Sequence, residues 1–321
     1  MTIAGRWHRR TKIIGGVGSA LVVLSLVVVG TVAAANAAPR GLRLTETHGA
    51  SAEWWRPEDA PARWIAPGLL AERAQWRRTS DGVEWSELAV SGGGEASALK
   101  LVALRIDPRR VRFALQWGVE RESGRPGWTV DTAPSEAVVA VNAGMFVDAL
   151  PWGCVKSRGG ELLAPGLGPL STAFAVLRDG TLEMAAGHDV QRLRERSDVI
   201  EAFQSYPTLL EGDGHVPLAL REGDAIDRTH RDARLALGLD RDGRAVLVLT
   251  RLDVGIAALA QLPVGLTVPQ MAAVMGSFGA ARAVLLDGGI SAQLQLREEN
   301  GARHVWRGVR AVPLALVVFA R

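Results

Sequence analysis

Ala283-Val284-Leu285-Leu286-Asp287-Gly288-Gly289-Ile290-Ser291-Ala292-Gln293 combines a short apolar run with an acid and two glycines. An apolar run of this length that ends at glycine is typical of a buried strand. Gly288 and Gly289 predict a tight turn, because glycine adopts positive φ and lets the backbone approach a ligand. The Asp287 carboxylate, backbone N–H groups and the Ser291 hydroxyl would then lie together. On this segment alone, a plain turn between two strands is the simpler interpretation, since Asp-Gly is a common turn signal.

A second segment of this kind lies far upstream, where Asn142-Ala143-Gly144-Met145-Phe146 follows an apolar strand that ends at Val141. Asn and Gly directly after a buried strand predict a loop, and an ordinary strand-end turn would explain them. A binding loop is the functional interpretation. The Asn142 amide can hold a sugar hydroxyl or a phosphate oxygen, and Gly144 lets the backbone come close. Asp148 follows shortly after.

The third segment is the polar stretch before the apolar strand predicted from Leu235. Arg234 stands alone at the start of this strand, where a guanidinium can hold a phosphate or carboxylate through two hydrogen bonds. An ion pair with an aspartate is the commoner structural explanation of such an arginine. His230 is a candidate proton donor, although a plain loop residue is the simpler interpretation.

The composition is globular, with 48% hydrophobic and 22% charged residues among 321. The net charge is only +3 at pH 7, and basic residues often neighbour acids, so nucleic acid is not an expected partner. The single cysteine, Cys154, excludes an intrachain disulfide and multi-cysteine zinc sites. Its apolar and glycine neighbours favour a small buried side chain.

Residues 1–39 have the pattern of a targeting segment. Arginine and lysine residues precede an uncharged stretch from Ile13 to Pro39, and Ala35-Asn36-Ala37 offers a cleavage site. The stretch predicts a signal peptide, and it is also long enough for an uncleaved N-terminal membrane anchor. Both interpretations place the rest of the chain outside the cytoplasm, in the periplasm or secreted.

Residues 40–82 are rich in Trp and Pro and predict a spacer that packs onto the following domain. A sugar-binding aromatic surface is the alternative for these tryptophans. From residue 83 the pattern is mostly one of strands. Three hairpins are predicted: 101–106 with 111–117, 173–177 with 182–184, and 235–239 with 245–249.

Helices are few in the predicted fold. One should begin after Thr267 as N-cap and end near Phe278, and a second should cover 189–195. Residues 312–319 predict the last strand. The predicted fold class is therefore α+β: a single strand-rich, mixed-sheet domain over residues 83–321.

Asn142, Arg234 and Asp287 all stand at the ends of predicted buried strands, and their surroundings resemble the phosphodiester glycosidase family. The family pattern is an Asp-Pro turn, an Asn-Gly-Gly-Phe-Phe loop, a Pro-x-Gly, a Pro-Arg-Thr-Ala-Ile-Gly strand and a Leu-Asp-Gly-Gly-Gly-Ser turn. The corresponding motifs occur here in the same order: Ile106-Asp107-Pro108, Asn142–Phe146, Pro151-Trp152-Gly153, Ala233–Gly238 and Leu286–Ser291. The chain departs from the pattern at Ala143, Met145, Ala233, Leu235 and Ile290.

The resemblance implies an extracytoplasmic hydrolase that cleaves the glycosidic bond of a sugar-1-phosphodiester, with a glycan or sugar phosphate as substrate. It implies that Asp287, Arg234 and Asn142 are catalytic. The residues implied in substrate binding are Gly144, Asp148, Gly288, Gly289, Ser291 and His230. Glycoside hydrolysis generally uses two carboxyl groups about 5–10 Å apart. The partner of Asp287 is left open among Asp148, Glu211 and Asp240.

Two other functions stay open. A non-catalytic envelope module that binds glycan or phosphoglycan would need Arg234 and Asn142 but not Asp287. A metal-dependent phosphodiesterase would use Asp287, Asp148 and His230 as ligands of a divalent cation, although the sequence has no compact metal motif. No other cofactor is expected.

Overall fold

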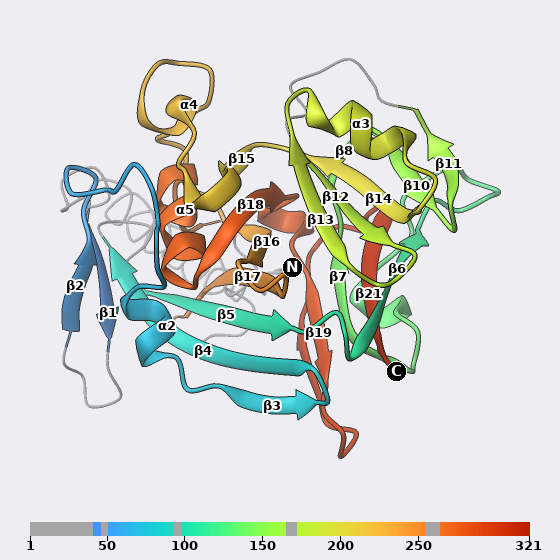
Figure 1. Cartoon of the computed structure of the whole chain (residues 1–321). Helices are drawn as coiled ribbons and strands as arrows, with labels where there is room; N and C mark the ends of the chain where they lie inside the picture. The colour runs from blue at the N-terminus through green and yellow to red at the C-terminus, as the bar shows by residue number, and fades with distance from the viewer. Residues whose placement is uncertain (1–40, 46–50, 93–97, 165–171, 254–263) are drawn as a thin grey trace, which may run out of the picture.

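The computed structural model describes residues 41–45, 51–92, 98–164, 172–253 and 264–321, and antiparallel strands make up the larger part of their regular secondary structure (Figure 1). The largest sheet, sheet A, has nine strands. In spatial order they are β15 (Thr208–Leu210), β18 (Ala280–Leu286), β16 (Leu235–Asp240), β17 (Ala245–Leu252), β5 (Leu99–Ile106), β4 (Val83–Gly92), β1 (Leu42–Thr45) and β2 (Ser51–Trp55), with β3 (Arg77–Ser80) also paired to β4.

Two five-stranded sheets and a hairpin complete the strands of the described residues. Sheet B runs in the order β11 (Gly160–Leu163), β10 (Val155–Ser157), β14 (Val199–Ser205), β12 (Thr172–Leu177) and β13 (Leu182–Ala186). Sheet C runs β20 (Arg303–Trp306), β19 (Leu294–Arg297), β7 (Ala137–Asn142), β21 (Leu314–Ala320) and β6 (Val111–Trp117), and the hairpin is β8 (Met145–Val147) with β9 (Leu150–Trp152). The α-helices are α2 (Leu69–Arg73), α3 (Asp189–Glu195), α4 (Leu218–Arg221) and α5 (Val268–Ser277).

The main core lies where the three sheets meet. One cluster of buried side chains draws on sheets A, B and C together, and a second packs the other face of sheet A against α5. Strand β18 is buried on both faces, with Val284 and Leu286 in the first cluster and Ala283 and Leu285 in the second. This double burial explains the unbroken apolar run that ends at Asp287.

The predicted helix after Thr267 is confirmed as α5. The Thr267 hydroxyl accepts from the backbone N–H of Gln270, and the Gln270 side chain accepts from the backbone N–H of Thr267. This reciprocal pair satisfies two N–H groups that a helix start leaves unpaired. Gly279 follows with φ +92°, which turns the chain back into β18. The helix predicted over 189–195 and two of the three hairpins, β12–β13 and β16–β17, are also confirmed.

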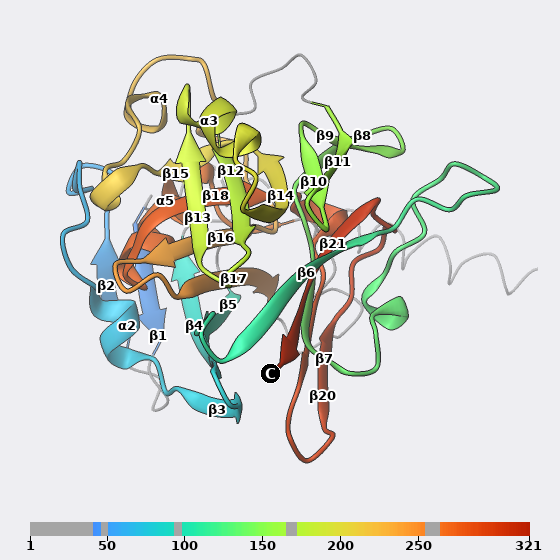
Figure 2. The same cartoon turned by 45° about the vertical axis from the view of Figure 1, so that its right-hand side comes forward.

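The hairpin predicted between 101–106 and 111–117 is wrong. Strand β5 lies between β4 and β17 in sheet A, whereas β6 pairs with β21 in sheet C (Figure 2). A tight turn does form, because the Asp107 carboxylate accepts from the backbone N–H of Arg109. The turn carries the chain from one sheet to another, and pairing over eight residues with β17 decides where β5 goes.

The predicted mixed sheet is also wrong, since every strand pair in the described residues is antiparallel. Parallel neighbours need a long crossover, usually a helix, and the four α-helices of the described residues are short. The strand-rich character with few helices is confirmed.

The region 40–82 was predicted as a spacer that packs onto the domain. Its described residues contribute β1, β2, α2 and β3, and Leu42, Leu44 and Trp55 are buried. Trp54, Trp55 and Trp64 line a surface cleft of about 330 Å³, and its use for sugar binding stays a prediction. The predicted targeting segment lies outside the described residues. Among those that are described, no helix is long and apolar enough to cross a membrane.

Candidate functional site

The Asp287 turn and the Asn142 loop are bound to each other. The side-chain amide of Asn142 donates to the carbonyl of Asp287 at 2.8 Å, and its oxygen accepts from the backbone N–H of Gln293 at 2.9 Å. The backbone N–H of Asp287 donates in turn to the carbonyl of Gly144 at 2.9 Å. Asn142 is buried, so its amide holds the turn in place, and contact with substrate stays a prediction.

The two glycines of the turn lie against the chain just before β16. The N–H of Gly289 donates to the carbonyl of Ala233, and a Cβ at Gly288 would meet that same oxygen at 2.4 Å. Gly289 has φ +53°, and a Cβ there would lie 2.9 Å from a carboxylate oxygen of Asp232. The glycines therefore allow two distant segments to come together beside Asp287.

We expect Gly288→Ala to lower the free energy of unfolding by about 1–3 kcal/mol, because backbone must shift to admit the new methyl group. Thermal denaturation would measure the loss. Gly160→Ala is the matched control, since its Cβ would have no neighbour closer than 3.7 Å. Equal melting temperatures for the two variants would contradict the close approach.

Two carboxylates belong to this site. Burial raises the pKa of Asp287 to about 6, and the negative charge of Asp232 adds to the rise. A hydrogen bond from the Ser291 hydroxyl and the positive charge of Arg310 act in the opposite direction. A pKa raised in this way is typical of functional carboxyl groups.

Asp232 was not among the second carboxylates predicted from the sequence. Its backbone forms a bridge with Leu266, through hydrogen bonds of 3.2 and 3.0 Å, and this bridge brings its side chain beside the Asp287 turn. The signal that could have found it is its place two residues before Arg234, directly before the Ala233–Gly238 motif that carries the family resemblance.

Arg234 is a largely buried cation. Its Nε donates to the carbonyl of Leu266 at 2.9 Å and its Nη2 to the carbonyl of His230 at 2.7 Å. Burial lowers its pKa, while Asp232 and Asp227 favour the charged form. These hydrogen bonds go to neutral carbonyls, so the negative charges that act on Arg234 are those of Asp232 and Asp227.

A second cation, Arg310, lies on the outer side of the site. Its guanidinium carbon is 4.6 Å from the centroid of the Phe146 ring, and its backbone N–H donates to the carbonyl of Ile290. Arg310 also lowers the pKa of Asp287. Arg310 was not predicted from the sequence, because no local motif marks it.

The other predicted site residues are placed as follows. Ser291 is buried, and its hydroxyl donates a hydrogen bond to the Asp287 carboxylate. His230 is exposed and its Nε2 is 3.9 Å from Asp232 Oδ2. Asp148 is exposed at the tip of the β8–β9 hairpin, with φ +55°.

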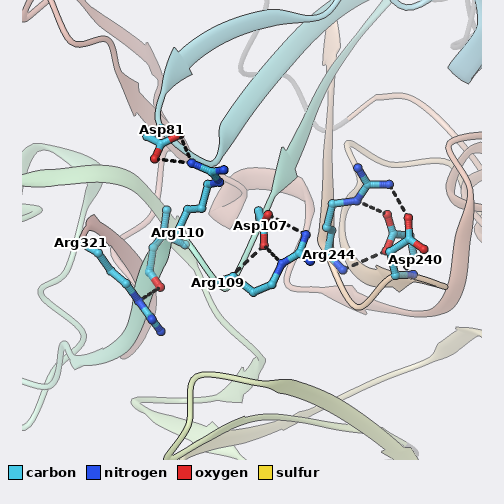
Figure 3. A network of polar contacts seen from close by, with 9 residues as sticks. Asp81, Asp107, Arg109, Arg110, Asp240, Arg244 and Arg321 are labelled. Atoms are coloured by element: carbon cyan, nitrogen blue, oxygen red, sulfur yellow. Dashed lines mark hydrogen bonds and ion pairs between the residues drawn. The ribbon is translucent and has the colours of Figure 1, made fainter.

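Two of the predicted second carboxylates lie away from Asp287. Asp240 ends β16, about 20 Å from Arg234 by the rise of a strand, and it is bound by Arg244 at 2.8 Å (Figure 3). It belongs to a group of surface ion pairs with Asp107 and Arg109 as neighbours (Figure 3). Glu211 follows β15 beyond the pair of Leu210 with Ala283, on the side of the sheet where β18 begins.

A model of the phosphodiester glycosidase family matches residues 135–319, more than half of the chain. The chain belongs to the phosphodiester glycosidase family. The matched range contains Asn142, Asp232, Arg234, Asp287 and Arg310.

Solved structures resemble this family member to different degrees. The catalytic domain of zebrafish N-acetylglucosamine-1-phosphodiester alpha-N-acetylglucosaminidase, auto-inhibited by pro-peptide, shares its fold, with a TM-score of 0.58 and 18% identity over 80% of this chain and 87% of that one. A hypothetical protein from Synechocystis matches with a TM-score of 0.49 and 18% identity, over 77% of this chain and 64% of its own. A putative exported protein from Burkholderia pseudomallei K96243 has a TM-score of 0.43 and 16% identity, over 70% and 74%. No curated protein matches the chain significantly.

The alternative of a metal-dependent phosphodiesterase requires a cluster of metal-ligating side chains. Among the described residues, no three His, Cys, Asp or Glu side chains are grouped so that they could hold a metal ion. Asp148 and His230 are both exposed, in different segments.

Cys154 is buried, as predicted. Burial raises the pKa of its thiol to about 11, with Glu161 nearby adding to the rise. The thiol therefore stays protonated at neutral pH and is a poor nucleophile.

Proposed function

We propose that this family member is an extracytoplasmic hydrolase that cleaves the glycosidic bond of a sugar-1-phosphodiester. The observation that carries the proposal is the pair of carboxylates, Asp287 with its pKa near 6 and Asp232 beside it, next to the cation Arg234. In glycoside hydrolysis, carboxylates act as nucleophile or general base at the anomeric carbon. A guanidinium binds a phosphate. The zebrafish relative is by its name a glycosidase of N-acetylglucosamine-1-phosphodiesters, which supports the same substrate class.

The reaction breaks the bond between the anomeric carbon and the phosphate oxygen. Asp287, in its ionised form, takes a proton from a water molecule whose oxygen bonds to the anomeric carbon, or it forms that bond itself and water then cleaves the resulting ester. The phosphate monoester leaves with its electron pair, and Arg234 stabilises the charge that develops on it. Phosphate is a good leaving group, so a strong general acid is not required. Burial keeps the pKa of Asp287 high, and the charge of Asp232 adds to the rise, which favours the basicity of the carboxylate.

The pH dependence of kcat/KM should show this arrangement. Activity needs ionised Asp287, so it should fall as the pH drops below about 6. In Ser291→Ala the carboxylate loses a stabilising hydrogen bond, and the midpoint should move to higher pH. In Asp232→Asn it loses a repelling charge, and the midpoint should move to lower pH. Midpoints that move in the same direction in both variants would contradict these roles of Ser291 and Asp232.

A hydrolysis screen tests the function itself. The purified chain from residue 41 onward would be assayed on a panel of sugar-1-phosphodiesters, with Asp287→Asn beside the wild type. Release of a phosphate monoester by the wild type alone supports the hydrolase. A non-catalytic module would bind glycan or phosphoglycan without hydrolysis, and Asp287→Asn would bind equally well.

A further inference from the structure

Arg251 in β17 is a buried cation with no opposite charge beside it among the described residues. Its side chain is 5% exposed, and Lys156, at 8%, is the other buried cation there. Burial alone lowers the pKa of Arg251 to about 10, so the guanidinium stays charged at neutral pH. The residue opposite it in β5 is Lys100, another cation. A buried charge without a counter-ion is costly, so the contacts that it does make are informative.

The hydrogen bonds of Arg251 go to backbone that belongs to the candidate site. Its Nη2 donates to the carbonyl of Ala292 and, at 3.3 Å, to the carbonyl of Arg307. Ala292 ends the turn that begins at Asp287. Arg307 lies three residues before Arg310. One guanidinium therefore joins the two segments that carry the carboxylate and the outer cation of the site.

The same two segments approach each other closely at Gly308. A Cβ there would lie 2.9, 3.0 and 3.2 Å from the carbonyl oxygens of Ile290, Ser291 and Ala292. Three carbonyl oxygens thus converge on one small space, and their partial negative charges repel one another. The guanidinium of Arg251 is bound to the third of these oxygens and offsets the repulsion, which a neutral donor would do less well.

Ser291 connects this backbone to Asp287. Its hydroxyl donates to the Asp287 carboxylate, and its carbonyl is one of the three converging oxygens. Besides burial and this hydrogen bond, the pKa of Asp287 responds to the charges of Arg310 and Asp232. The charge of Arg251 is not among these causes, so Arg251 acts on Asp287 through the backbone of the turn.

We infer that Arg251 is a positioning residue of the candidate site, and that its hydrogen bonds fix the turn so that the Ser291 hydroxyl faces the Asp287 carboxylate. The inference deepens the proposed function and rests on it for the kinetic effects. Without the guanidinium, the carbonyl of Ala292 lacks a donor, the end of the turn shifts, and the hydrogen bond from Ser291 weakens. A positioning role also accounts for a buried cation whose partners are two neutral carbonyls beside the site.

Titration of Asp287 tests the inference without any catalysis. Carbon-13 NMR of the purified protein, labelled at the aspartate side chains, follows this carboxyl group, and Asp287→Asn identifies its signal by the loss of that signal. In Arg251→Met the titration midpoint should move up by about 0.5–1 pH unit, since a hydrogen bond that stabilises the ionised form weakens. Arg251→Lys should show a smaller rise, because an ammonium keeps a charged donor but cannot reproduce the planar guanidinium.

Lys156→Met is the matched control. Lys156 is the other buried cation, and its Nζ likewise donates to two backbone carbonyls, those of Arg196 at 2.8 Å and Arg194 at 3.4 Å, at the end of α3 in another part of the fold. Thermal denaturation should show a loss of stability in this variant, because two carbonyls lose their donor. The midpoint of Asp287 should stay where it is in the wild type.

Kinetics on a cleavable sugar-1-phosphodiester provide the second readout. Arg251→Met should lower kcat by about tenfold to a hundredfold, the size expected when a reacting group is displaced, and should change KM by less than about threefold. Lys156→Met should keep the kcat of the wild type. A general loss of stability would not produce this difference between the two variants at a temperature at which both are folded.

Several results would overturn the inference. An Asp287 midpoint in folded Arg251→Met equal to that of the wild type would do so, as would an equal rise in Lys156→Met. If Arg251→Met does not fold, Arg251→Lys decides in its place, and an unchanged midpoint there counts against the positioning role. An unchanged kcat beside a raised midpoint would also exclude it. If the midpoints move as expected while the wild type hydrolyses no sugar-1-phosphodiester, the proposed function fails and the positioning of Asp287 by Arg251 stands.

Discussion

Asp287→Asn should lower kcat on a cleavable sugar-1-phosphodiester by about 10²- to 10⁴-fold and leave the dissociation constant of the substrate nearly unchanged. Asparagine has the same shape as aspartate and can still bond the Ser291 hydroxyl, but it cannot act as a base or nucleophile. Single-turnover rates and equilibrium binding would separate the two effects. Asp242→Asn, an exposed carboxylate in the β16–β17 turn, is the control.

The Asp287→Asn substitution should also stabilise the protein at neutral pH. The pKa of Asp287 is raised from 3.8 to about 6, so the folded state binds the proton more tightly than the unfolded chain does. Stability is therefore lost as the pH rises from about 4 to about 6, by roughly 3 kcal/mol in total. Asparagine does not ionise. The variant should match the wild type near pH 4 and exceed its free energy of unfolding above pH 7.

Thermal denaturation of the wild type and Asp287→Asn near pH 4 and at pH 7.5 would measure this difference in stability. A variant that is inactive because it fails to fold, or one that is less stable than the wild type at pH 7.5, would return Asp287 to the role of a plain turn residue. Asp242→Asn keeps Asp287, so its stability should follow that of the wild type at both pH values.

Arg234→Ala should lower kcat/KM by about tenfold to a hundredfold, the size expected for one charge-assisted contact with phosphate. It should also lower the free energy of unfolding by about 1–3 kcal/mol, because the carbonyls of Leu266 and His230 lose their donor. Arg234→Lys should recover part of the activity, since an ammonium restores the charge but cannot reproduce the planar arrangement of donors.

Steady-state kinetics at a temperature well below the melting point of each variant separates activity from folding. Arg192→Ala, on the exposed face of α3, is the control for a lost surface arginine. If Arg234→Ala is less stable but keeps full kcat/KM, then Arg234 only ties the segment before β16 to Leu266.

Local patterns were sufficient where neighbours in the sequence are also neighbours in space. The capping of α5 by Thr267, the turns of the β12–β13 and β16–β17 hairpins and the buried run of β18 all depend on residues a few positions apart. The turn at Asp107 forms as predicted, but the destination of β6 depends on β21, about two hundred residues further along. Local sequence contains no information about which sheet a strand joins.

The site shows the same division. The sequence placed Asn142, Arg234 and Asp287 at strand ends, and the structure brings their segments together through hydrogen bonds to backbone groups. It did not show that both ends of the Asn142 amide are taken by the Asp287–Gln293 segment, or that Asp232 is the neighbouring carboxylate. The first fact depends on a contact across about 150 residues of sequence, and the second on the close approach of Gly288 and Gly289 to Ala233 and Asp232.

The bridge made by Asn142 has a consequence for how the protein reaches its native state. Its two hydrogen bonds reach Asp287 and Gln293, which are 145 and 151 positions further along the chain. Arg310 comes from still further along. Contacts of such long sequence separation close late and slow the folding of β-rich proteins. During refolding, sheet formation should therefore precede the recovery of activity. A chain still emerging from the ribosome would carry no working site until its last strands were made.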